Sequence, residues 1–169
     1  MSLQTTSVTD WMHADVPTLA PEGPVRAALD GALDSPVGCV VVVDERRRVR
    51  GIVTEGDVIR RVLSEEVPGG AFLRSVLSSP DAVLRYLRDA ERSHGGTVAD
   101  LMTEPVVTLN ASATMMQAAQ LFHTRALRQV PIVDANGALV GLLNRRDIVR
   151  AIFEQHDEAE RQLDGEHGT

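Results

Sequence analysis

Short apolar runs of strand length recur along the chain. Val40–Val43 and Val130–Val133 are continuous apolar runs, which predicts strands that are covered on both faces. The run Val106–Leu109 is rich in β-branched residues and predicts a brief buried strand. A turn signal, Asp134–Gly137, precedes the apolar run Leu139–Leu143, so we expect a hairpin at this point of the chain.

Helical spacing fills the intervals between these runs. Thr114 and Gln117 have the spacing of a capping box, which predicts that a helix begins there. Pro24 is expected at the first position of an earlier helix, and a last helix is expected to begin near Asp147. The predicted apolar faces of the first two helices are Val25, Ala28, Leu29 and Ala32 in the earlier one and Met115, Ala118, Ala119 and Phe122 in the later one.

The chain repeats itself at an offset of 90 residues, without gaps. Residues 8–60 and 98–150 share 13 identities over 53 positions, far above chance. Each copy has the order strand, helix, strand, strand, helix, so the sequence predicts an α/β (α+β) fold built from two tandem units. The identical pairs are Val8/Val98, Asp10/Asp100, Met12/Met102, Val16/Val106, Thr18/Thr108, Leu19/Leu109, Ala28/Ala118, Val40/Val130, Val43/Val133, Asp44/Asp134, Gly51/Gly141, Asp57/Asp147 and Arg60/Arg150.

Two further segments complete the expected organisation. Residues 61–97 contain the helix start Ser79–Asp81 and the helix stop Gly95–Gly96, which predicts a helical connector packed on the repeats. The second repeat, with the rest of its last helix, is expected to span 98–153. Residues 154–169 carry a net charge of −5, out of −7 for the whole chain, which is typical of a solvated helical extension.

Composition and charge exclude several classes of function. All 17 basic residues are arginine, so chemistry that requires lysine, such as a Schiff base or a phosphate-binding loop, is excluded. Outside the acidic tail the net charge is only −2, which disfavours nucleic-acid binding. No stretch reaches the ~18 apolar residues of a membrane span. Cys39 is the only cysteine and the five histidines share no ligand spacing, so we expect no disulfide, no metal site and a cytoplasmic protein.

The most informative motif is a heptad that occurs once in each copy. It reads Gly-Ile-Val-Thr-Glu-Gly-Asp up to Asp57 and Gly-Leu-Leu-Asn-Arg-Arg-Asp up to Asp147. Thr54 with Asp57, and Asn144 with Asp147, match helix-capping patterns. The functional alternative is that the helix N-terminus and the Thr54 hydroxyl bind a phosphate, while Asp57 accepts hydrogen bonds from two ribose hydroxyls. The two roles are compatible, and the sequence leaves both open.

Together these features resemble a tandem cystathionine-β-synthase (CBS) domain pair of the bacterial stand-alone type, with a helical insert between the repeats. The resemblance rests on Asp-x-Met at the start of each copy, Val-Pro-Ile-Val-Asp in the middle of the second, and Gly-apolar-apolar-Thr/Asn-x-x-Asp at the end. It implies two β-α-β-β-α repeats related by a pseudo-twofold axis, a Bateman module that binds adenosyl ligands in clefts between its halves. It also implies a regulatory role and, usually, a homodimer.

Carried over position by position, the resemblance implies two nucleotide clefts. The second copy departs from the family at Asn144, where Thr or Ser is usual. Arg145 and Arg146 place positive charge at a helix start, which is unfavourable unless an anion is bound; simple solvent exposure is the alternative. Cys39 is expected to be a small buried side chain, with lining of the second cleft as the alternative. The first cleft would join Thr54, Gly56 and Asp57 with Val107, Leu127, Arg128 and Gln129, and the second would join Asn144, Arg146 and Asp147, beside Arg145, with Pro17, Val37, Gly38 and Cys39.

We therefore expect a regulatory, non-enzymatic module whose occupancy by AMP, ADP or ATP changes its shape or its contacts with an effector protein. S-adenosylmethionine and NAD are alternative ligands, because an adenine contacted by backbone leaves little trace in a sequence. The competing hypothesis is a dimerisation or protein-interaction module with empty clefts. An enzyme is disfavoured because no nucleophile lies in a recognisable catalytic setting.

Overall fold

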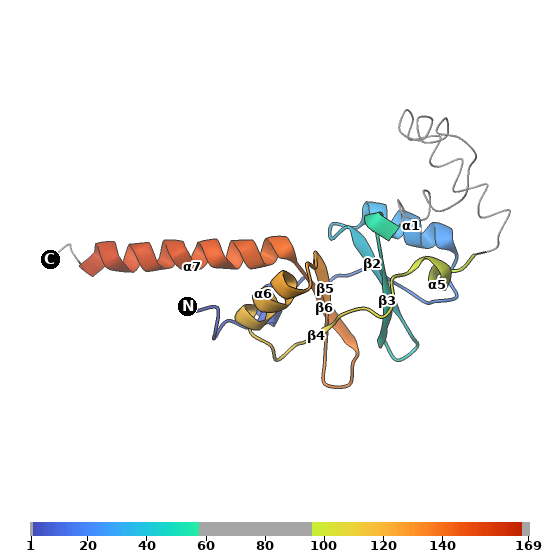
Figure 1. Ribbon diagram of the computed structural model, residues 1–169, viewed down its shortest axis with the longest axis horizontal. Coiled ribbons are helices and arrows are strands. Elements are labelled where there is room, and N and C mark those ends of the chain that lie inside the picture. Colours follow the sequence, from blue (N-terminus) through green and yellow to red (C-terminus); the bar gives the residue numbers. More distant parts are fainter. Residues whose placement is uncertain (1, 58–95, 167–169) are drawn as a thin grey trace, which may run out of the picture. The chain divides into compact units, whose positions relative to one another are not determined.

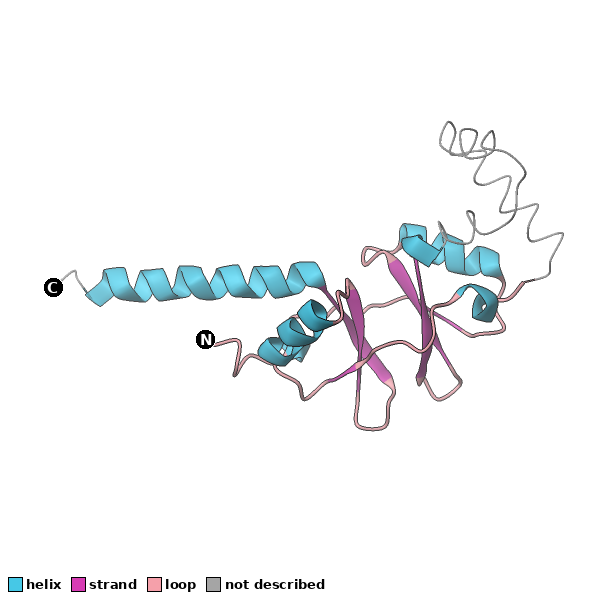
Figure 2. Ribbon diagram, in the orientation of Figure 1, coloured by secondary structure: helices cyan, strands magenta, loops and turns pink. Residues whose placement is uncertain are grey.

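The computed structural model of the protein describes residues 2–57 and 96–166, with side chains through residue 157. The chain forms two compact units, each built on one three-stranded sheet (Figure 1, Figure 2). Most of the helical connector expected at 61–97 lies outside the described residues. Unit 1 comprises Met1–Val16, Arg47–Val49 and Val107–Thr169, and unit 2 comprises Pro17–Arg46 and Arg50–Val106.

Unit 2 contains the sheet with strand order β1–β2–β3. β1 (Thr18–Leu19) runs parallel to β2 (Cys39–Val43), and β3 (Val49–Thr54) lies on the other side of β2. The helices α1 (Val25–Asp34) and α5 (Val98–Leu101) lie beside this sheet and contact each other. As predicted for a strand covered on both faces, every residue of β2 is buried. The core of the unit consists of Ala28, Leu29, Val42, Val53, Val98 and Leu101.

Unit 1 repeats this arrangement with the strand order β4–β5–β6. β4 (Leu109–Asn110) is parallel to β5 (Gln129–Val133), and β5 is antiparallel to β6 (Leu139–Asn144). The register places Gln129 opposite Asn144. The first residue of β5 and the last residue of β6 are therefore neighbours at one end of the hairpin, which positions the candidate site described below.

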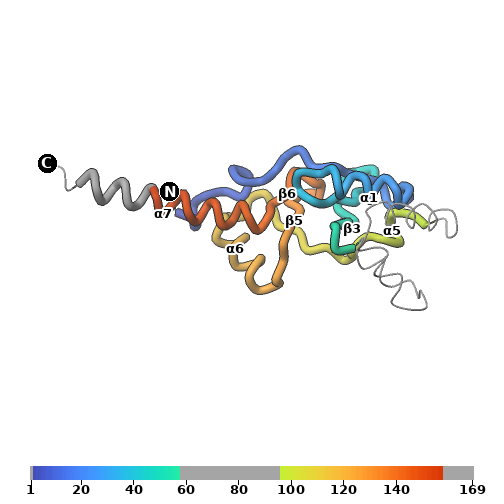
Figure 3. The backbone as a smooth tube through the Cα atoms, turned by 90° about the horizontal axis from the view of Figure 1, so that it is seen from above, coloured from blue at the N-terminus to red at the C-terminus, as the bar shows by residue number. Residues whose placement is uncertain are grey.

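Two helices pack against the elements of unit 1 (Figure 1, Figure 3). α6 (Met115–Thr124) begins with the predicted capping box: the Gln117 N–H donates to Thr114 Oγ1 over 3.3 Å, and Gln117 Oε1 accepts the Thr114 N–H over 3.0 Å. α7 (Arg145–Glu166) follows β6 directly and contacts both α6 and β6. Beyond these contacts it continues well past the sheet of its unit.

The turns of the two hairpins differ at one equivalent position. Asp134 Oδ1 accepts the N–H groups of Ala138 (2.9 Å) and Asn136 (2.8 Å), and these hydrogen bonds lower the pKa of the Asp134 carboxyl. Gly137 has a φ of +82°, which glycine adopts without strain. Arg47, 90 residues earlier, holds the same left-handed region with a φ of +60°, which costs a residue with a side chain roughly 1–2 kcal/mol.

Each unit takes its first helical turn from the other sequence copy. The short 3-10 helix η1 (Val8–Asp10) belongs to the first copy, yet Val8 is fully buried in the core of unit 1. Val98, the equivalent residue in α5, is fully buried in the core of unit 2. The compact units therefore differ from the two sequence copies. The first residues of each copy pack in the core that is otherwise formed by the other copy.

The Asp-x-Met motif holds these exchanged segments in place. Met102 lies over Gly51 in unit 2, and Met12 lies over Gly141 in unit 1. A Cβ on either glycine would be only 2.5 Å from the methionine sulfur. The glycine at the start of each heptad therefore makes room for a methionine from the other copy, which gives both motif positions a packing role.

The predicted fold class is confirmed, with differences at the ends of elements. The strand expected at Val106–Leu109 is not formed as a buried run: β4 covers Leu109–Asn110 and is not buried, because it lies at a sheet edge and pairs with β5 alone. Pro24 is the N-cap residue of α1, with an extended ψ of 141°, and not its first helical residue. α7 begins at Arg145, because Asp147 caps the first turn from inside the helix.

Candidate functional site

The carboxylate of Asp57 closes the first turn of the helix that follows β3. β3 ends at Thr54, and residues 55–57 are helical, so Asp57 is the third helical residue. Thr54 donates its N–H over 2.8 Å and its hydroxyl over 2.7 Å to Asp57 Oδ2. Asp57 is only 3% exposed. The capping role that the sequence left open is therefore present, and it uses the hydroxyl hydrogen of Thr54.

Thr103 completes this arrangement from the start of the second copy. Its backbone pairs with Ile52 of β3 through two hydrogen bonds of 2.8 and 3.3 Å. This pairing brings the Thr103 hydroxyl to Asp57 Oδ1, to which it donates over 2.6 Å. Both carboxylate oxygens of Asp57 thus accept hydrogen bonds from the protein. We call Thr54, Asp57 and Thr103 the Asp57 cluster.

Unit 1 contains the equivalent arrangement with different side chains. Asp147 is 5% exposed, and its Oδ2 accepts the Asn144 N–H over 2.8 Å. His13 pairs with Leu142 of β6 through backbone hydrogen bonds of 2.8 and 2.9 Å. Its Nε2 lies 3.2 Å from Asp147 Oδ2 and 3.3 Å from Oδ1. We call His13, Asn144 and Asp147 the Asp147 cluster.

Sequence reasoning identified the aspartates but missed Thr103 and His13. The signal that could have found them is the repeat itself: positions 13 and 103 are equivalent, and each follows directly after the methionine of Asp-x-Met. The residues differ between the copies, so identity did not mark them. The structure shows that both face the carboxylate of the same motif position.

The residues predicted beside the adenine lie at the end of each sheet where the aspartate cluster of that unit is found. In unit 1, Arg145 donates its Nε (3.1 Å) and Nη2 (2.6 Å) to the Leu127 carbonyl, and its N–H to the Arg128 carbonyl (2.9 Å). The side chain of Arg145 is thus held by the segment before β5, although it is exposed. Arg146 is exposed as well. Leu127, Arg128, Gln129, Asn144, Arg145, Arg146 and Asp147 therefore lie together in unit 1, which also contains Val107.

Unit 2 gathers the remaining predicted residues. Pro17 precedes β1, and its carbonyl accepts the Val41 N–H over 3.0 Å. Val37 and Gly38 lead into β2 at Cys39, at the end of the hairpin where β3 reaches Thr54. The unit thus contains Pro17, Val37, Gly38, Cys39, Thr54, Gly56 and Asp57. The predicted pairing of residues across the two copies joins residues of different units and stays a prediction.

The two helix starts differ in charge. The residues between Thr54 and Asp57 are Glu55 and Gly56, whereas those between Asn144 and Asp147 are Arg145 and Arg146. An anion is stabilised at a helix start by nearby positive charge and destabilised by negative charge. The helix start of unit 1 is therefore the better environment for phosphate, although its capping residue is Asn144.

Cys39 behaves as a buried apolar residue. It is fully buried at the start of β2, and desolvation raises the pKa of its thiol to about 12. The thiol therefore stays protonated at neutral pH. This matches the expectation of a small buried side chain at this position.

A cavity of about 610 Å³ opens elsewhere on unit 2. Exposed charges of both signs line it, and none of the predicted nucleotide-binding residues does. Among the side chains of residues 2–57 and 96–157, no three from His, Cys, Asp or Glu are grouped to hold a metal ion. No helix in the same part of the chain is long and apolar enough to cross a membrane.

Comparison with known proteins identifies the repeat. The family model of the CBS domain matches residues 8–64 and 98–154. The chloroplastic CBS domain-containing protein CBSX2 of Arabidopsis thaliana is 26% identical over 145 residues, which are 83% of this chain and 60% of CBSX2. Protein MK0525 of Methanopyrus kandleri is 29% identical over 114 residues, 68% of this chain. The matching part spans only 46% of the length of MK0525.

Solved structures share the fold. The crystal structure of CBSX2 in complex with AMP has a TM-score of 0.65 at 25% identity and covers 89% of this chain and 98% of that chain. The CBS domain pair of protein MJ0100, in complex with 5′-methylthioadenosine and S-adenosyl-L-methionine, has a TM-score of 0.61 at 19% identity, over 87% of this chain and 99% of that one; at this identity the likeness concerns the fold alone. Because the family model matches both copies, and with them well over half of the residues, the chain belongs to the family of CBS-domain proteins.

Proposed function

We propose that the protein is a regulatory, non-catalytic module that binds adenosyl nucleotides beside its two aspartate clusters. The observation that carries the proposal is a buried aspartate at the start of a helix in each unit, in a chain whose relative CBSX2 was crystallised with AMP. In the Asp57 cluster both threonine hydroxyls donate to the buried carboxylate of Asp57, which also closes a helix turn, so we take the clusters as binding rather than catalytic arrangements.

The proposed role of Asp57 and Asp147 is to accept hydrogen bonds from ribose hydroxyls. A carboxylate offers about four acceptor sites, and its orientation is already fixed by the capping N–H in each unit. At Asp57 three of these sites already accept from Thr54 and Thr103, so a diol would keep the capping N–H bond and take the place of the Thr54 hydroxyl. Thr103 and His13 then act as positioning residues, because each holds the second side of its carboxylate.

The charge difference between the helix starts supports different ligands in the two units. Arg145 and Arg146 favour the longer phosphate chain of ADP or ATP at the Asp147 cluster. Glu55 beside the Asp57 cluster favours a ligand with less negative charge, such as AMP or S-adenosylmethionine. The proposed contacts of the adenine are those predicted from the sequence. They are Val107, Leu127, Arg128 and Gln129 in the first cleft and Pro17, Val37, Gly38 and Cys39 in the second.

The proposed regulatory action is a shift between conformations. A ligand shifts such an equilibrium only by its differential affinity for the two states. An effector protein would then bind one of the two conformations in preference to the other. We place the protein in the cytoplasm, where a buried, unpaired cysteine is usual, and expect a homodimer. A second candidate, a dimerisation module without ligand, is favoured by the exposed apolar residues of α7.

A thermal-shift panel tests the ligand class. AMP, ADP, ATP, S-adenosylmethionine and NAD are compared with GMP and GTP, which carry the same phosphates on a different base. A ligand at about 100 times its Kd stabilises by about 2.7 kcal/mol, which raises the Tm of a chain of this size by several degrees. No shift with any adenosyl compound, or equal shifts with the guanine nucleotides, would contradict the proposal.

A further inference from the structure

The contacts that Asp147 makes leave its Oδ2 atom with no acceptor site for a further donor. Oδ2 accepts the Asn144 N–H over 2.8 Å and lies 3.2 Å from His13 Nε2, which is also 3.3 Å from Oδ1. Each carboxylate oxygen offers about two acceptor sites. A ligand diol that donates one hydroxyl to each oxygen of Asp147 can therefore reach Oδ2 only if His13 gives up its contact with this atom.

Asp57 differs from Asp147 in the group that a diol has to displace. Its Oδ2 accepts the N–H and the hydroxyl of Thr54, and its Oδ1 accepts the Thr103 hydroxyl. A diol that reaches Oδ2 of Asp57 therefore displaces a neutral hydroxyl. At Asp147 it displaces an imidazole, a group that gains or loses a charge between pH 5 and 8. Only the Asp147 cluster thus places a group that titrates near neutral pH on the proposed ribose acceptor.

Asp147 is the group that balances a positive charge on His13. The His13 side chain is 42% exposed, so it exchanges protons with solvent, whereas the Asp147 side chain is 7% exposed. Among the described residues, His13 forms an ion pair with Asp147 alone. The strand β6, with which the His13 backbone pairs, has no charged residue, and the acids nearest in sequence, Asp10 and Asp15, are exposed.

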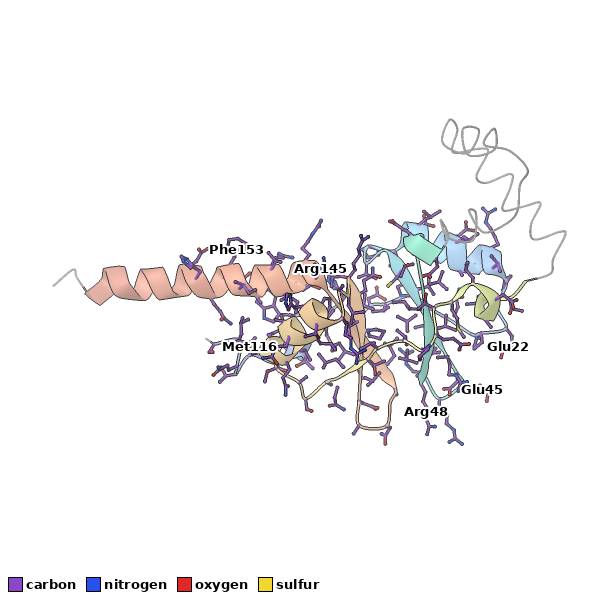
Figure 4. All side chains as sticks on the ribbon, viewed as in Figure 1. Glu22, Glu45, Arg48, Met116, Arg145 and Phe153 are labelled. Atoms are coloured by element: carbon purple, nitrogen blue, oxygen red, sulfur yellow. The ribbon has the colours of Figure 1, made fainter. Side chains whose placement is uncertain are left out.

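The other charged residues in the first two turns of α7 are arginines. Arg145 lies at the beginning of the helix (Figure 4), where its guanidinium donates to the Leu127 carbonyl. Arg146 and Arg150 are exposed. A diol on Asp147 weakens the contact of His13 with its counter-ion and leaves these cations in place. Because like charges repel, a bound diol favours loss of the His13 proton to solvent.

We propose that ligand binding at the Asp147 cluster is coupled to the charge of His13: the protonated imidazole holds Oδ2 and weakens binding, and a bound ribose favours release of its proton. A charge-assisted hydrogen bond is roughly twice as strong as a neutral one, so the neutral imidazole is displaced more readily. The inference rests on the proposed function, to which it adds regulation by pH at one of the two sites. Binding at the Asp57 cluster, which has Thr103 in place of His13, does not depend on pH in this range.

Calorimetry with adenosine and with AMP, at about pH 5.5 and 7.5, tests the coupling. Adenosine carries the diol without a phosphate, a group that itself titrates near pH 6. We expect binding at one site of the wild type to be about three- to tenfold weaker at the lower pH. His13→Gln keeps a side-chain N–H donor that does not titrate, so this variant should lose the difference. The titration of AMP itself is the same for both proteins and cancels in the comparison.

Two further variants complete the test, with circular dichroism at both pH values to verify that each is folded. His13→Thr introduces the residue that the other copy has at the equivalent position, and it should behave like His13→Gln. His123→Gln is the matched control, because His123 is an exposed histidine of α6 in the same unit, and it should keep the pH dependence of the wild type. Equal pH dependence in the wild type and both His13 variants, or tighter binding by the wild type at the lower pH, would overturn the coupling. Absence of binding by both ligands at both pH values would overturn the proposed function as well, so the two failures are distinguishable.

Discussion

Thr103 donates its hydroxyl hydrogen to Asp57 over 2.6 Å, across 46 positions of the chain. In the other unit the equivalent contact is made by His13 to Asp147. The aspartate of each copy is thus held by the first residues of the other copy. Because those residues also pair with the strand before the aspartate, the folding of each unit and the orientation of its carboxylate are coupled.

The first prediction concerns nucleotide affinity. Asp57→Asn keeps the size of the side chain and an oxygen that can accept from Thr54, but it replaces one acceptor by a donor. We expect adenosyl nucleotides to bind ten- to a hundredfold more weakly, because a charge-assisted hydrogen bond contributes about 1.5–3 kcal/mol. Asp147→Asn is the matched variant in the other unit, and we expect Asp57→Asn to have the larger effect on AMP. Calorimetry with AMP and ATP measures both. Unchanged affinity in both variants would leave helix capping as the role of the aspartates.

The second prediction isolates the positioning role of Thr103. Thr103→Val keeps the shape of the side chain and removes the donor to the buried Asp57 Oδ1, so we expect the free energy of unfolding to fall by about 1–3 kcal/mol. Thr103→Ser keeps the hydroxyl and serves as the control. Urea denaturation distinguishes the two. Equal stability of the valine and serine variants would show that the hydrogen bond contributes nothing measurable.

The third prediction concerns the contact between Gly51 and Met102. A Cβ at position 51 would lie 2.5 Å from the Met102 sulfur, so Gly51→Ala should lower the free energy of unfolding by about 1–3 kcal/mol. Truncation of the methionine removes the clash. The double variant with Met102→Ala should therefore be more stable than the sum of the two single effects predicts. Strict additivity in this mutant cycle would argue against the contact.

The fourth prediction uses the two hairpin turns as controls for each other. Arg47→Gly relieves a φ of +60° and should raise the free energy of unfolding by up to about 1 kcal/mol. Gly137→Ala should lower it by a similar amount through backbone strain alone, because a Cβ at this position meets no atom within 4 Å. Thermal unfolding of both variants gives the comparison, and shifts of the same sign would be inconsistent with it.

The fifth prediction follows from the buried thiol of Cys39, whose pKa is raised to about 12 by desolvation. The folded protein should react with a thiol reagent at pH 8 far more slowly than the urea-unfolded chain. Above about pH 9 the thiol ionises in the unfolded chain but stays protonated in the folded protein, and this lowers the free energy of unfolding. The stability that depends on the protonated thiol is therefore complete below pH 9 and is lost as the pH rises toward 12. Cys39→Ala should remove that part of the alkaline loss. Rapid labelling of the folded chain would contradict the burial.

Local sequence signals determined the secondary structure and the family. The capping box of Thr114 and Gln117, the buried strands and the turn at Asp134–Gly137 depend on residues a few positions apart, and their spacing is visible in the sequence. The gap-free offset of 90 residues identified the copies. The two aspartates were found in the same way, because capping is a local interaction over three residues.

Only the tertiary structure decided which side chains meet those aspartates. His13 lies 134 positions from Asp147, and no local period connects residues so far apart. The sequence also could not show that Arg145 donates to the Leu127 carbonyl, 18 positions away. For this side chain the sequence left solvent exposure and anion binding as the two alternatives. The sequence likewise could not show that Val8 packs in the core of unit 1 and Val98 in the core of unit 2. Because the two copies have equivalent sheets, the first helical turn of each copy could pack on either sheet. Only the three-dimensional packing decides which sheet it covers.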